Sequence, residues 1–372
     1  MRAWNFCAGP AAIPEEVLKE VQEELLEWND AKSSVMEVSH RSDFFQEVAS
    51  ESKKDFIELL NIPENYDVLF LQGGATQQFA MIPLNFVKNG KANYLMTGTW
   101  SKKAIAAASK YLEITIPISN EDNKFTSIPE NFSKWSEFNL DADYSHYCAN
   151  ETIQGFSLRS FHKDYTHKLN MRAVPLLCDM SSSILSEPLE VADFDLIYAG
   201  AQKNIGPAGL TIIIIEKNLF SKINSNLPDI FNYEKHANAN SMLNTPPTFA
   251  WYLSGKVFKW LKEKGGLAAM QKINEEKAKT LYQFIDQSSM YSNLVESNFR
   301  SIMNIPFLLK DPAFDRLFLE NANKAGLLNL KGHRSVGGMR ASIYNATPIE
   351  AVNDLIDFMD CLLYTSDAAD DG

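Results

Sequence analysis

The chain has 372 residues, and its 35 Lys and Arg against 47 Asp and Glu give a formal net charge of -12. This balance argues against a nucleic-acid-binding surface, and no apolar run approaches the ~20 residues that a membrane-spanning helix needs. The length predicts about two domains.

The positions of the cysteines and histidines bear on disulfides, cellular location and metal binding. The four cysteines, Cys7, Cys148, Cys178 and Cys361, are widely spaced and form no CxxC pair. We therefore expect no disulfide framework. Because the N-terminus shows no charged-then-apolar signal segment, we also expect a cytoplasmic location. The histidines show no metal-ligand spacing, so no metal site is predicted.

The N-terminal segment combines an irregular start with two predicted helices. Residues 1–14 read as irregular, and Pro14 then opens an amphipathic helix. A loop follows in which His40 and Arg41 are adjacent. Two neighbouring cations in a loop can bind an anion, but a solvated polar loop is the more common explanation. A second amphipathic helix is expected over residues 44–60.

The first predicted strand leads directly into paired glycines. Residues 66–71 (YDVLFL) read as a buried strand, residues 73–76 are Gly-Gly-Ala-Thr, and an apolar helix is expected over residues 77–86. Free N–H groups at such a helix start can hold a phosphate. No P-loop and no GxGxxG occur, so a dinucleotide is not indicated. A plain tight turn is the alternative.

Four later predicted strands also end in residues that could bind a ligand. They span residues 91–96, 144–148, 174–178 and 195–199, and the side chains that follow them are Trp100, Thr152, Asp179 and Lys203. Each has an ordinary alternative, such as a core tryptophan, a helix cap or a solvated lysine. Because strands alternate with helices, we expect an α/β fold with a mostly parallel, doubly wound sheet. All these strand ends then share one edge.

This convergence suits pyridoxal phosphate. A lysine amine can form a Schiff base with its aldehyde, and an acid can keep its ring nitrogen protonated. An aromatic ring can stack on its face, and a glycine turn can hold its phosphate. Burial between strand 195–199 and the apolar run 211–215 would push Lys203 toward its neutral, nucleophilic form.

The last third of the chain predicts a smaller α+β domain. A long helix is expected over residues 267–287, and further elements over residues 300–309, 312–325, 327–330, 340–344 and 348–363. His333, Arg334 and Arg340 form a cationic cluster beside two glycines, which suits a phosphate or a carboxylate. A solvated basic turn is the alternative.

These patterns predict two domains. The large one, residues 15–258, would bind the cofactor. The smaller one would combine residues 1–14 with residues 259–363, with a hinge near Gly265 and Gly266. Residues 364–372 show no apolar period, so we expect a disordered or non-native tail there.

Nine stretches of the chain resemble the phosphoserine aminotransferases, a family of fold-type I pyridoxal-phosphate enzymes. They are residues 5–11 (NFCAGPA), 39–42 (SHRS), 73–76 (GGAT), 98–101 (GTWS), 150–153 (NETI), 179–182 (DMSS), 200–207 (GAQKNIGP), 244–248 (NTPPT) and 332–342 (GHRSVGGMRAS). The resemblance covers about residues 5–363 in the right order. The stretches around Lys203 and Arg340 are specific to this family.

The resemblance implies a reaction and an assembly. The reaction is amino-group transfer from L-glutamate to 3-phosphohydroxypyruvate, which gives O-phospho-L-serine and 2-oxoglutarate in serine biosynthesis. The assembly is a homodimer with active sites at the interface. Some family members are similar enough to act also on the phosphonooxy keto acid of pyridoxine biosynthesis.

The resemblance also implies roles at the cofactor. Lys203 would carry the Schiff base, and Asp179 would pair with the ring nitrogen. Trp100 would stack on the ring, and Thr152 would bond its 3-oxygen. Five further residues would hold the cofactor phosphate: Ala75, Thr76 and Gln202 of one subunit, and Asn244 and Thr245 of the other.

For the substrate, the resemblance implies that Arg340 binds the α-carboxylate. The substrate phosphate, or the side-chain carboxylate of glutamate, would meet four residues: His40, Arg41, His333 and Arg334. The alternatives are a serine–pyruvate type aminotransferase, a cysteine desulfurase or a non-catalytic PLP-binding module. A desulfurase needs a mobile catalytic cysteine, for which Cys361 on the predicted last helix is a poor candidate.

Overall fold

The computed structural model describes residues 2–128, 138–159 and 174–370. In this part of the chain, seven strands form a central sheet of order β2-β10-β9-β8-β5-β3-β4. Strands β3, β4, β5, β8 and β9 run parallel, and β10 is antiparallel to both of its neighbours. The strands are β2 (Tyr66–Gln72), β3 (Lys91–Tyr94), β4 (Glu113–Thr115), β5 (Tyr144–Cys148), β8 (Leu176–Asp179), β9 (Leu196–Gly200) and β10 (Leu210–Glu216).

Apolar side chains cover both faces of this sheet. In β10, Ile212 and Ile214 pack in one core cluster, while Ile213 and Ile215 pack in another on the opposite face. This period of two explains why the strand is an unbroken apolar run. The predicted doubly wound, mostly parallel sheet is confirmed.

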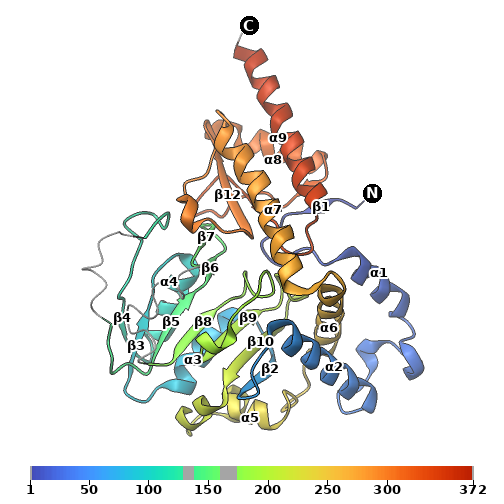
Figure 1. Cartoon of the computed structure of the whole chain (residues 1–372), viewed down its shortest axis with the longest axis vertical. Coiled ribbons are helices and arrows are strands. Elements are labelled where there is room, and N and C mark those ends of the chain that lie inside the picture. Colours follow the sequence, from blue (N-terminus) through green and yellow to red (C-terminus); the bar gives the residue numbers. More distant parts are fainter. Residues whose placement is uncertain (1, 129–137, 160–173, 371–372) are drawn as a thin grey trace.

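Helices pack on both faces of the sheet (Figure 1). One core cluster contains side chains of α1 (Glu15–Glu24), α2 (Asp43–Leu60) and α6 (Thr248–Glu263). The other contains side chains of α3 (Ala75–Phe86), α4 (Thr99–Ala108) and α5 (Tyr233–Asn238). Short 3-10 helices connect these elements: η1 (Asn29–Ala31), η2 (Val35–Glu37), η6 (Val191–Asp193), η7 (Lys217–Lys222) and η8 (Asp229–Phe231).

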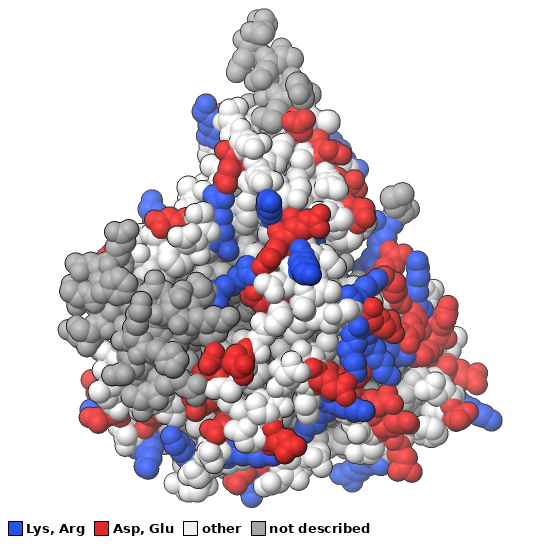
Figure 2. All heavy atoms as spheres, viewed as in Figure 1, with Lys and Arg blue, Asp and Glu red and all other residues white. Residues whose placement is uncertain are grey.

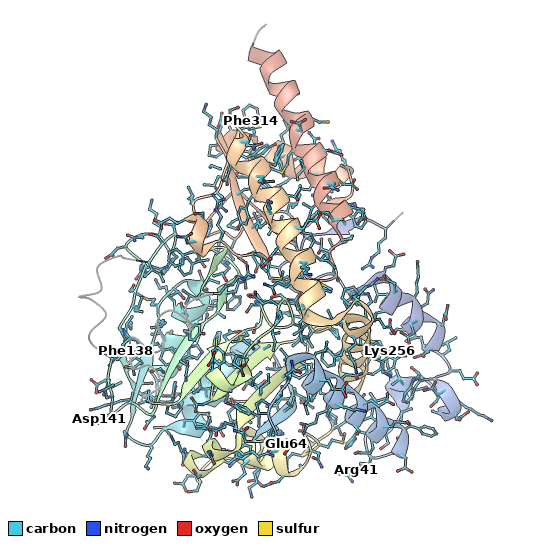
Figure 3. All side chains as sticks on the ribbon, viewed as in Figure 1. Arg41, Glu64, Phe138, Asp141, Lys256 and Phe314 are labelled. Atoms are coloured by element: carbon cyan, nitrogen blue, oxygen red, sulfur yellow. The ribbon has the colours of Figure 1, made fainter. Side chains whose placement is uncertain are left out.

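Ion pairs join α6 to α1 and α2 at the surface. Lys256 pairs with Glu24 at 3.0 Å, and Lys259 pairs with Glu51 at 2.9 Å. Figure 2 shows the closely interleaved charges on this side of the molecule, where Figure 3 labels Lys256. The Lys259–Glu51 pair is exposed, and such pairs contribute about 0–1 kcal/mol, whereas the Lys256–Glu24 pair is partly buried.

A smaller body lies above the sheet in Figure 1. It contains α7 (Gly266–Gln287), η9 (Ser297–Phe299), η10 (Pro312–Phe314), α8 (Asp315–Lys324), α9 (Ile349–Asp370), and a three-stranded antiparallel sheet of β11 (Tyr291–Ser292), β12 (Asn304–Leu309) and β14 (Met339–Ser342). The N-terminal strand β1 (Trp4–Asn5) pairs with β13 (Leu327–Leu328), so the start of the chain joins this body.

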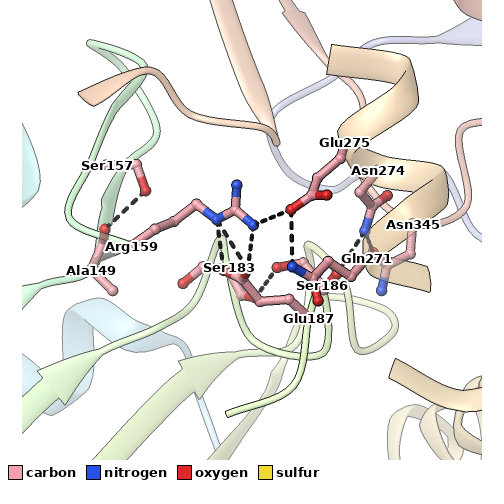
Figure 4. A network of polar contacts seen from close by, with 10 residues as sticks. All are labelled: Ala149, Ser157, Arg159, Ser183, Ser186, Glu187, Gln271, Asn274, Glu275 and Asn345. Carbon is pink, nitrogen blue, oxygen red and sulfur yellow. Dashed lines mark hydrogen bonds and ion pairs between the residues drawn. The ribbon is translucent and has the colours of Figure 1, made fainter. Parts of the chain in front are cut away.

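The change from one core to the other occurs within α7. Leu267 and Met270 pack in the large core, whereas Ala278 and Leu281 pack in the small one. The predicted domain boundary after residue 258 therefore falls inside α6, whose later side chains still belong to the large core. Polar contacts also tie α7 to the large domain (Figure 4), where Arg159 Nη2 lies 2.8 Å from Glu275 Oε1.

The structure corrects several predicted boundaries. Helix α4 begins at Thr99, earlier than predicted, so Trp100 stands in its first turn. Helix α9 continues to Asp370, whereas the sequence predicts an irregular tail from residue 364, because extending an existing helix costs far less than starting one. Residues 371–372 of that tail, and residues 129–137 of a predicted polar loop, lie outside the described residues.

A short hairpin after β5 was not predicted. Strands β6 (Asn150–Glu151) and β7 (Phe156–Ser157) pair antiparallel, and Thr152 lies in the turn between them. Gly155 in this turn has φ +66°, and a Cβ there would lie 2.3 Å from Pro306 Cδ. Glycine is therefore required for the hairpin to pack against β12. No helix in the described ranges is both long and apolar enough to cross a membrane.

Candidate active site

The carboxyl ends of neighbouring strands bring the predicted side chains together. Asp179 is the last residue of β8, and Lys203 is the third residue after the end of β9. Thr152 lies in the turn of the hairpin that follows β5. This is the edge at which open α/β sheets bind ligands.

Lys203 is a partly buried amine without a carboxylate partner in the part of the chain that the structure describes. Its Nζ donates to Thr152 Oγ1 at 2.7 Å and lies 5.5 Å from the centroid of the Trp100 ring. Burial lowers the pKa of Lys203 to about 8, although the nearby Asp179 carboxylate raises it. A substantial fraction of the amine is therefore neutral and nucleophilic near pH 8.

Asp179 is a buried acid held by polar neighbours. Burial raises its pKa, while Lys203, the Ser181 N–H and the Tyr198 hydroxyl lower it. Ser181 N donates to Asp179 Oδ1 at 2.8 Å. Tyr198 stands opposite Asp179 on β9, and its hydroxyl lies 2.9 Å from His146 Nε2. Burial lowers the pKa of His146 to about 3, so this imidazole is neutral.

Trp100 is fixed by a buried carboxylate that the sequence did not reveal. Glu151 accepts hydrogen bonds from Trp100 N at 2.8 Å and from Ser101 N at 2.9 Å, and so caps the N-terminus of α4. A Cβ at residue 98 would lie 2.4 Å from Glu151 Cδ, which explains Gly98. The indole Nε1 of Trp100 is buried and has no hydrogen-bond partner among the described residues.

The N-terminus of α3 forms an open cradle. The helix begins at Ala75, and the residue before it, Gly74, supplies no side-chain cap. A Cβ at Gly74 would meet nothing within 4 Å, so the space in front of the helix is open. Ala75 and Thr76 present N–H groups of the first turn there, which suits a phosphate. Gln202, the third residue of this chain that is predicted to hold the cofactor phosphate, packs against Gly9.

Cations approach this edge from the small domain. Arg340 on β14 has its Nη1 3.5 Å from the Thr152 carbonyl oxygen, and its Nε is buried without a partner among the described residues. The pKa of His333 is lowered by burial and then by Arg340, Lys103 and Arg334. These four groups therefore share one electrostatic environment suited to an anion.

Lys103 was missed by the sequence reasoning. Its Nζ lies 4.4 Å from the centroid of the Trp100 ring. The signal was available, because residues three apart on a helix share a face, and Trp100 was already a candidate.

Four predicted residues lie elsewhere on the chain. Asn244, Thr245 and Arg41 are exposed, and Figure 3 shows Arg41 at the far end of the large domain from the small domain. Gln46 Nε2 donates to the carbonyl oxygen of His40 at 2.8 Å and lies 3.0 Å from Met242 Sδ. Within this chain, the His40 loop thus neighbours the segment that carries Asn244, not the Lys203 site.

Comparison with known proteins decides the family. The model of the class-V aminotransferases matches residues 3–355. The phosphoserine aminotransferase of Hahella chejuensis is 53% identical over 359 residues, covering 96% of this chain and 97% of the relative. The chain belongs to the phosphoserine aminotransferase family.

Solved structures agree with this membership. The phosphoserine aminotransferase of Bacillus circulans subsp. alkalophilus superposes with a TM-score of 0.92 at 41% identity, covering 98% of this chain and 99% of that one. A PLP-bound phosphoserine aminotransferase from Trichomonas vaginalis gives a TM-score of 0.90 at 40% identity, covering 96% of this chain and 100% of that one.

The residues of this site fit the cofactor of the phosphoserine aminotransferases, pyridoxal phosphate. A half-neutral lysine, a buried acid, an aromatic ring and an uncapped helix start surround one edge of the sheet. In the described ranges, no group of three or more His, Cys, Asp or Glu side chains could hold a metal ion.

Proposed function

We propose that this protein transfers the amino group of L-glutamate to 3-phosphohydroxypyruvate, giving O-phospho-L-serine and 2-oxoglutarate in serine biosynthesis. The observation that supports the proposal is Lys203, whose pKa is lowered by burial to about 8 and whose Nζ donates to Thr152 Oγ1. The free cysteines Cys7, Cys148, Cys178 and Cys361 accord with a reducing cytoplasm, where we place the enzyme.

We propose that the site residues hold pyridoxal phosphate as follows. Lys203 binds it covalently, Asp179 pairs with its ring nitrogen, Trp100 stacks on its ring and Thr152 bonds its 3-oxygen. Its phosphate meets Ala75, Thr76 and Gln202, with Asn244 and Thr245 supplied by a second subunit. When bound, this cofactor supplies an aldehyde that accepts an amino group and a ring that withdraws electrons.

The residues of the chain then have separable tasks. Arg340 binds the substrate α-carboxylate through charge-assisted hydrogen bonds. Lys203, once its amine is free, accepts the proton from the substrate Cα and returns it, and a pKa near neutrality suits that exchange. Burial raises the pKa of Asp179 and Lys203 lowers it, so a cation beside Asp179 favours its ionised form.

His333 and Arg334, together with His40 and Arg41 of a second subunit, would bind either the substrate phosphate or the side-chain carboxylate of glutamate. One cationic region can accept both anions, so a single site serves both half-reactions. We also propose the phosphonooxy keto acid of pyridoxine biosynthesis as a second acceptor, because it is likewise a phosphorylated keto acid.

A homodimer is the arrangement that we propose for the remaining residues. Arg41 lies at the end of the large domain far from the small domain, and the His40 loop neighbours the segment that carries Asn244 and Thr245. In a symmetric dimer, these residues of each subunit would lie in the active site of the other subunit.

A subunit-mixing experiment tests the dimer. Lys203→Ala and Arg41→Ala proteins are each expected to be nearly inactive. After mixing and exchange of subunits, each mixed dimer has one intact site if Arg41 acts across the interface, so about a quarter of wild-type activity should return. No recovery despite subunit exchange would contradict a shared site. Mixing Lys203→Ala with itself is the matched control.

The reaction is tested by its two half-reactions. The cofactor-loaded enzyme is mixed with L-phosphoserine, L-glutamate or L-serine, and the visible absorbance of the cofactor is followed. Conversion by phosphoserine and glutamate but not by serine is expected. A preference for unphosphorylated serine would instead indicate a serine–pyruvate type aminotransferase, release of sulfide from cysteine a desulfurase, and no conversion by any amino acid a non-catalytic cofactor-binding protein.

A further inference from the structure

A buried series of hydrogen bonds leaves Lys203 and leads toward the small domain. Lys203 Nζ donates to Thr152 Oγ1 at 2.7 Å, and Thr152 Oγ1 donates to Ser182 Oγ at 3.1 Å. Ser182 Oγ in turn donates to the carbonyl oxygen of Asn150 at 2.9 Å. Each hydroxyl in the series both accepts and donates, so its single hydrogen has a defined direction.

Asn304 of β12 continues the series across the domain boundary. Its Oδ1 accepts from Asn150 Nδ2 at 2.8 Å, and its Nδ2 donates to Ser342 Oγ and to the Tyr344 hydroxyl, both at 3.0 Å. The Asn304 side chain is fully buried. Both of its amide hydrogens are in use, so the orientation of the amide is fixed. Tyr344 then donates to the Ala8 carbonyl oxygen at 2.9 Å.

The series returns to its start through Arg340. Asn304 stands directly opposite Ser342 in the β12–β14 pair, and Pro306 stands opposite Arg340. Ser342 and Arg340, two residues apart on one strand, share a face of the sheet. Arg340 Nη1 makes a weak hydrogen bond, 3.5 Å long, to the carbonyl oxygen of Thr152. These hydrogen bonds, together with the β14 backbone between Ser342 and Arg340, therefore form a closed ring between the two domains.

We propose that Asn304 is a positioning residue that holds the hairpin carrying Thr152, which lies beside Lys203, at a set distance from the Arg340 guanidinium. This inference rests on the proposed function, in which Arg340 holds the substrate carboxylate and Lys203 moves the proton at the neighbouring carbon. Those two groups of the substrate are joined by one bond, so the two side chains must keep a set separation. A misplacement of about 1 Å in such a site can cost a hundredfold in rate.

Asn304→Asp is the sharpest perturbation, because it keeps the shape of the side chain and removes both N–H donors. The hydroxyls of Ser342 and Tyr344 must then turn to donate to the new carboxylate, and Tyr344 gives up its bond to Ala8. The contact between Asn304 and β14, the strand that carries Arg340, is therefore weakened. Ser342→Ala removes only the hydrogen bond between Asn304 and Ser342, which is a smaller change. It therefore serves as a second test if the Asn304→Asp protein does not fold.

Asn293→Asp is the matched control. Asn293 also lies in the small domain, and its Nδ2 donates to the carbonyl oxygen of Pro306 at 2.6 Å. Its loss removes a hydrogen bond to the same strand β12 without touching the ring. A purely structural effect of Asn304 should resemble the effect of this control.

The experiment uses the cofactor-loaded enzymes. Steady-state kinetics give KM and kcat for L-phosphoserine and L-glutamate, and calorimetry gives the dissociation constant of 2-oxoglutarate without an amino donor. We expect KM and this dissociation constant to rise about tenfold in Asn304→Asp and in Ser342→Ala, the factor for one lost hydrogen bond, and to stay within about twofold in Asn293→Asp.

The inference is overturned if Asn304→Asp or Ser342→Ala lowers thermal stability yet keeps the KM values and the 2-oxoglutarate affinity of the control. The wild-type enzyme separates this failure from failure of the proposed function. Wild-type enzyme that converts neither amino acid refutes the function, whereas wild-type turnover with unaffected variants refutes only the role of Asn304.

Discussion

Replacing Lys203 with methionine in the cofactor-free protein should remove a pH-dependent cost of folding. Burial lowers the pKa of Lys203 from 10.5 to about 8. Between these values, the unfolded chain keeps the proton and the folded chain loses it, so the unfolding free energy of the wild type rises with pH. The whole cost is present below pH 8, and it disappears above pH 10.5.

The size of the effect follows from the two pKa values. Their difference corresponds to about 3 kcal/mol, of which about 2.5 kcal/mol falls between pH 7 and pH 10. Methionine carries no charge but loses the hydrogen bond to Thr152, worth about 1 kcal/mol. The Lys203→Met protein should therefore be about 2 kcal/mol more stable than the wild type at pH 7, and about equally stable at pH 10.

Urea unfolding of both cofactor-free proteins at pH 7, 8, 9 and 10, followed by tryptophan fluorescence, measures this difference. Groups whose charged neighbours are the same in both proteins cancel in the comparison. A stability difference that does not change with pH would refute the reasoning. Acetylation of Lys203 with acetic anhydride provides a direct check: its midpoint should be about 8 in the folded protein and about 10.4 in urea.

Three further substitutions test the site. Glu151→Gln should lower the unfolding free energy, measured by urea unfolding, by about 1–2 kcal/mol. The two carboxylate oxygens accept from two N–H groups of the first turn of α4, and glutamine keeps only one acceptor oxygen; a negligible change would contradict that role. Arg340→Lys should raise KM for glutamate and phosphoserine roughly a hundredfold in steady-state assays, because lysine cannot make the paired contacts; unchanged KM values would argue against carboxylate binding there. Tyr198→Phe should weaken pyridoxal phosphate binding about tenfold in titrations of the cofactor-free protein, because Asp179 loses a hydroxyl donor. An unchanged affinity would show that this hydroxyl does not contribute to cofactor binding.

Parallel strands made part of the site readable from the chain. Because their carboxyl ends lie at one edge, a side chain just after each strand is placed by the fold class alone, and this brings Asp179 and Lys203 together. The class of fold was therefore predicted correctly, and the family was predicted correctly from the resemblance of the nine stretches. Trp100 was placed correctly along the chain although its helix starts earlier than predicted.

Residues that act through long-range contacts could not be read in this way. Glu151 caps a helix about 50 residues earlier in the chain, and Asn304 meets Asn150 from another domain. Nothing local marks such residues, because their sequence neighbours do not determine which distant groups they contact. His40 and Arg41 illustrate the opposite case, since their motif was recognised but their position on the molecule was not.

The sequence by itself determined the alternation of strands and helices, the order of the motifs and the position of Lys203 just after a strand. These depend on local periodicity and on residue type. Only the tertiary structure decided how acidic or basic each group is, since the pKa values of Lys203 and Asp179 depend on the burial that the packed domains create. It also decided that Lys203 and Arg340 are joined through Asn304, because hydrogen bonds between domains exist only after both have packed.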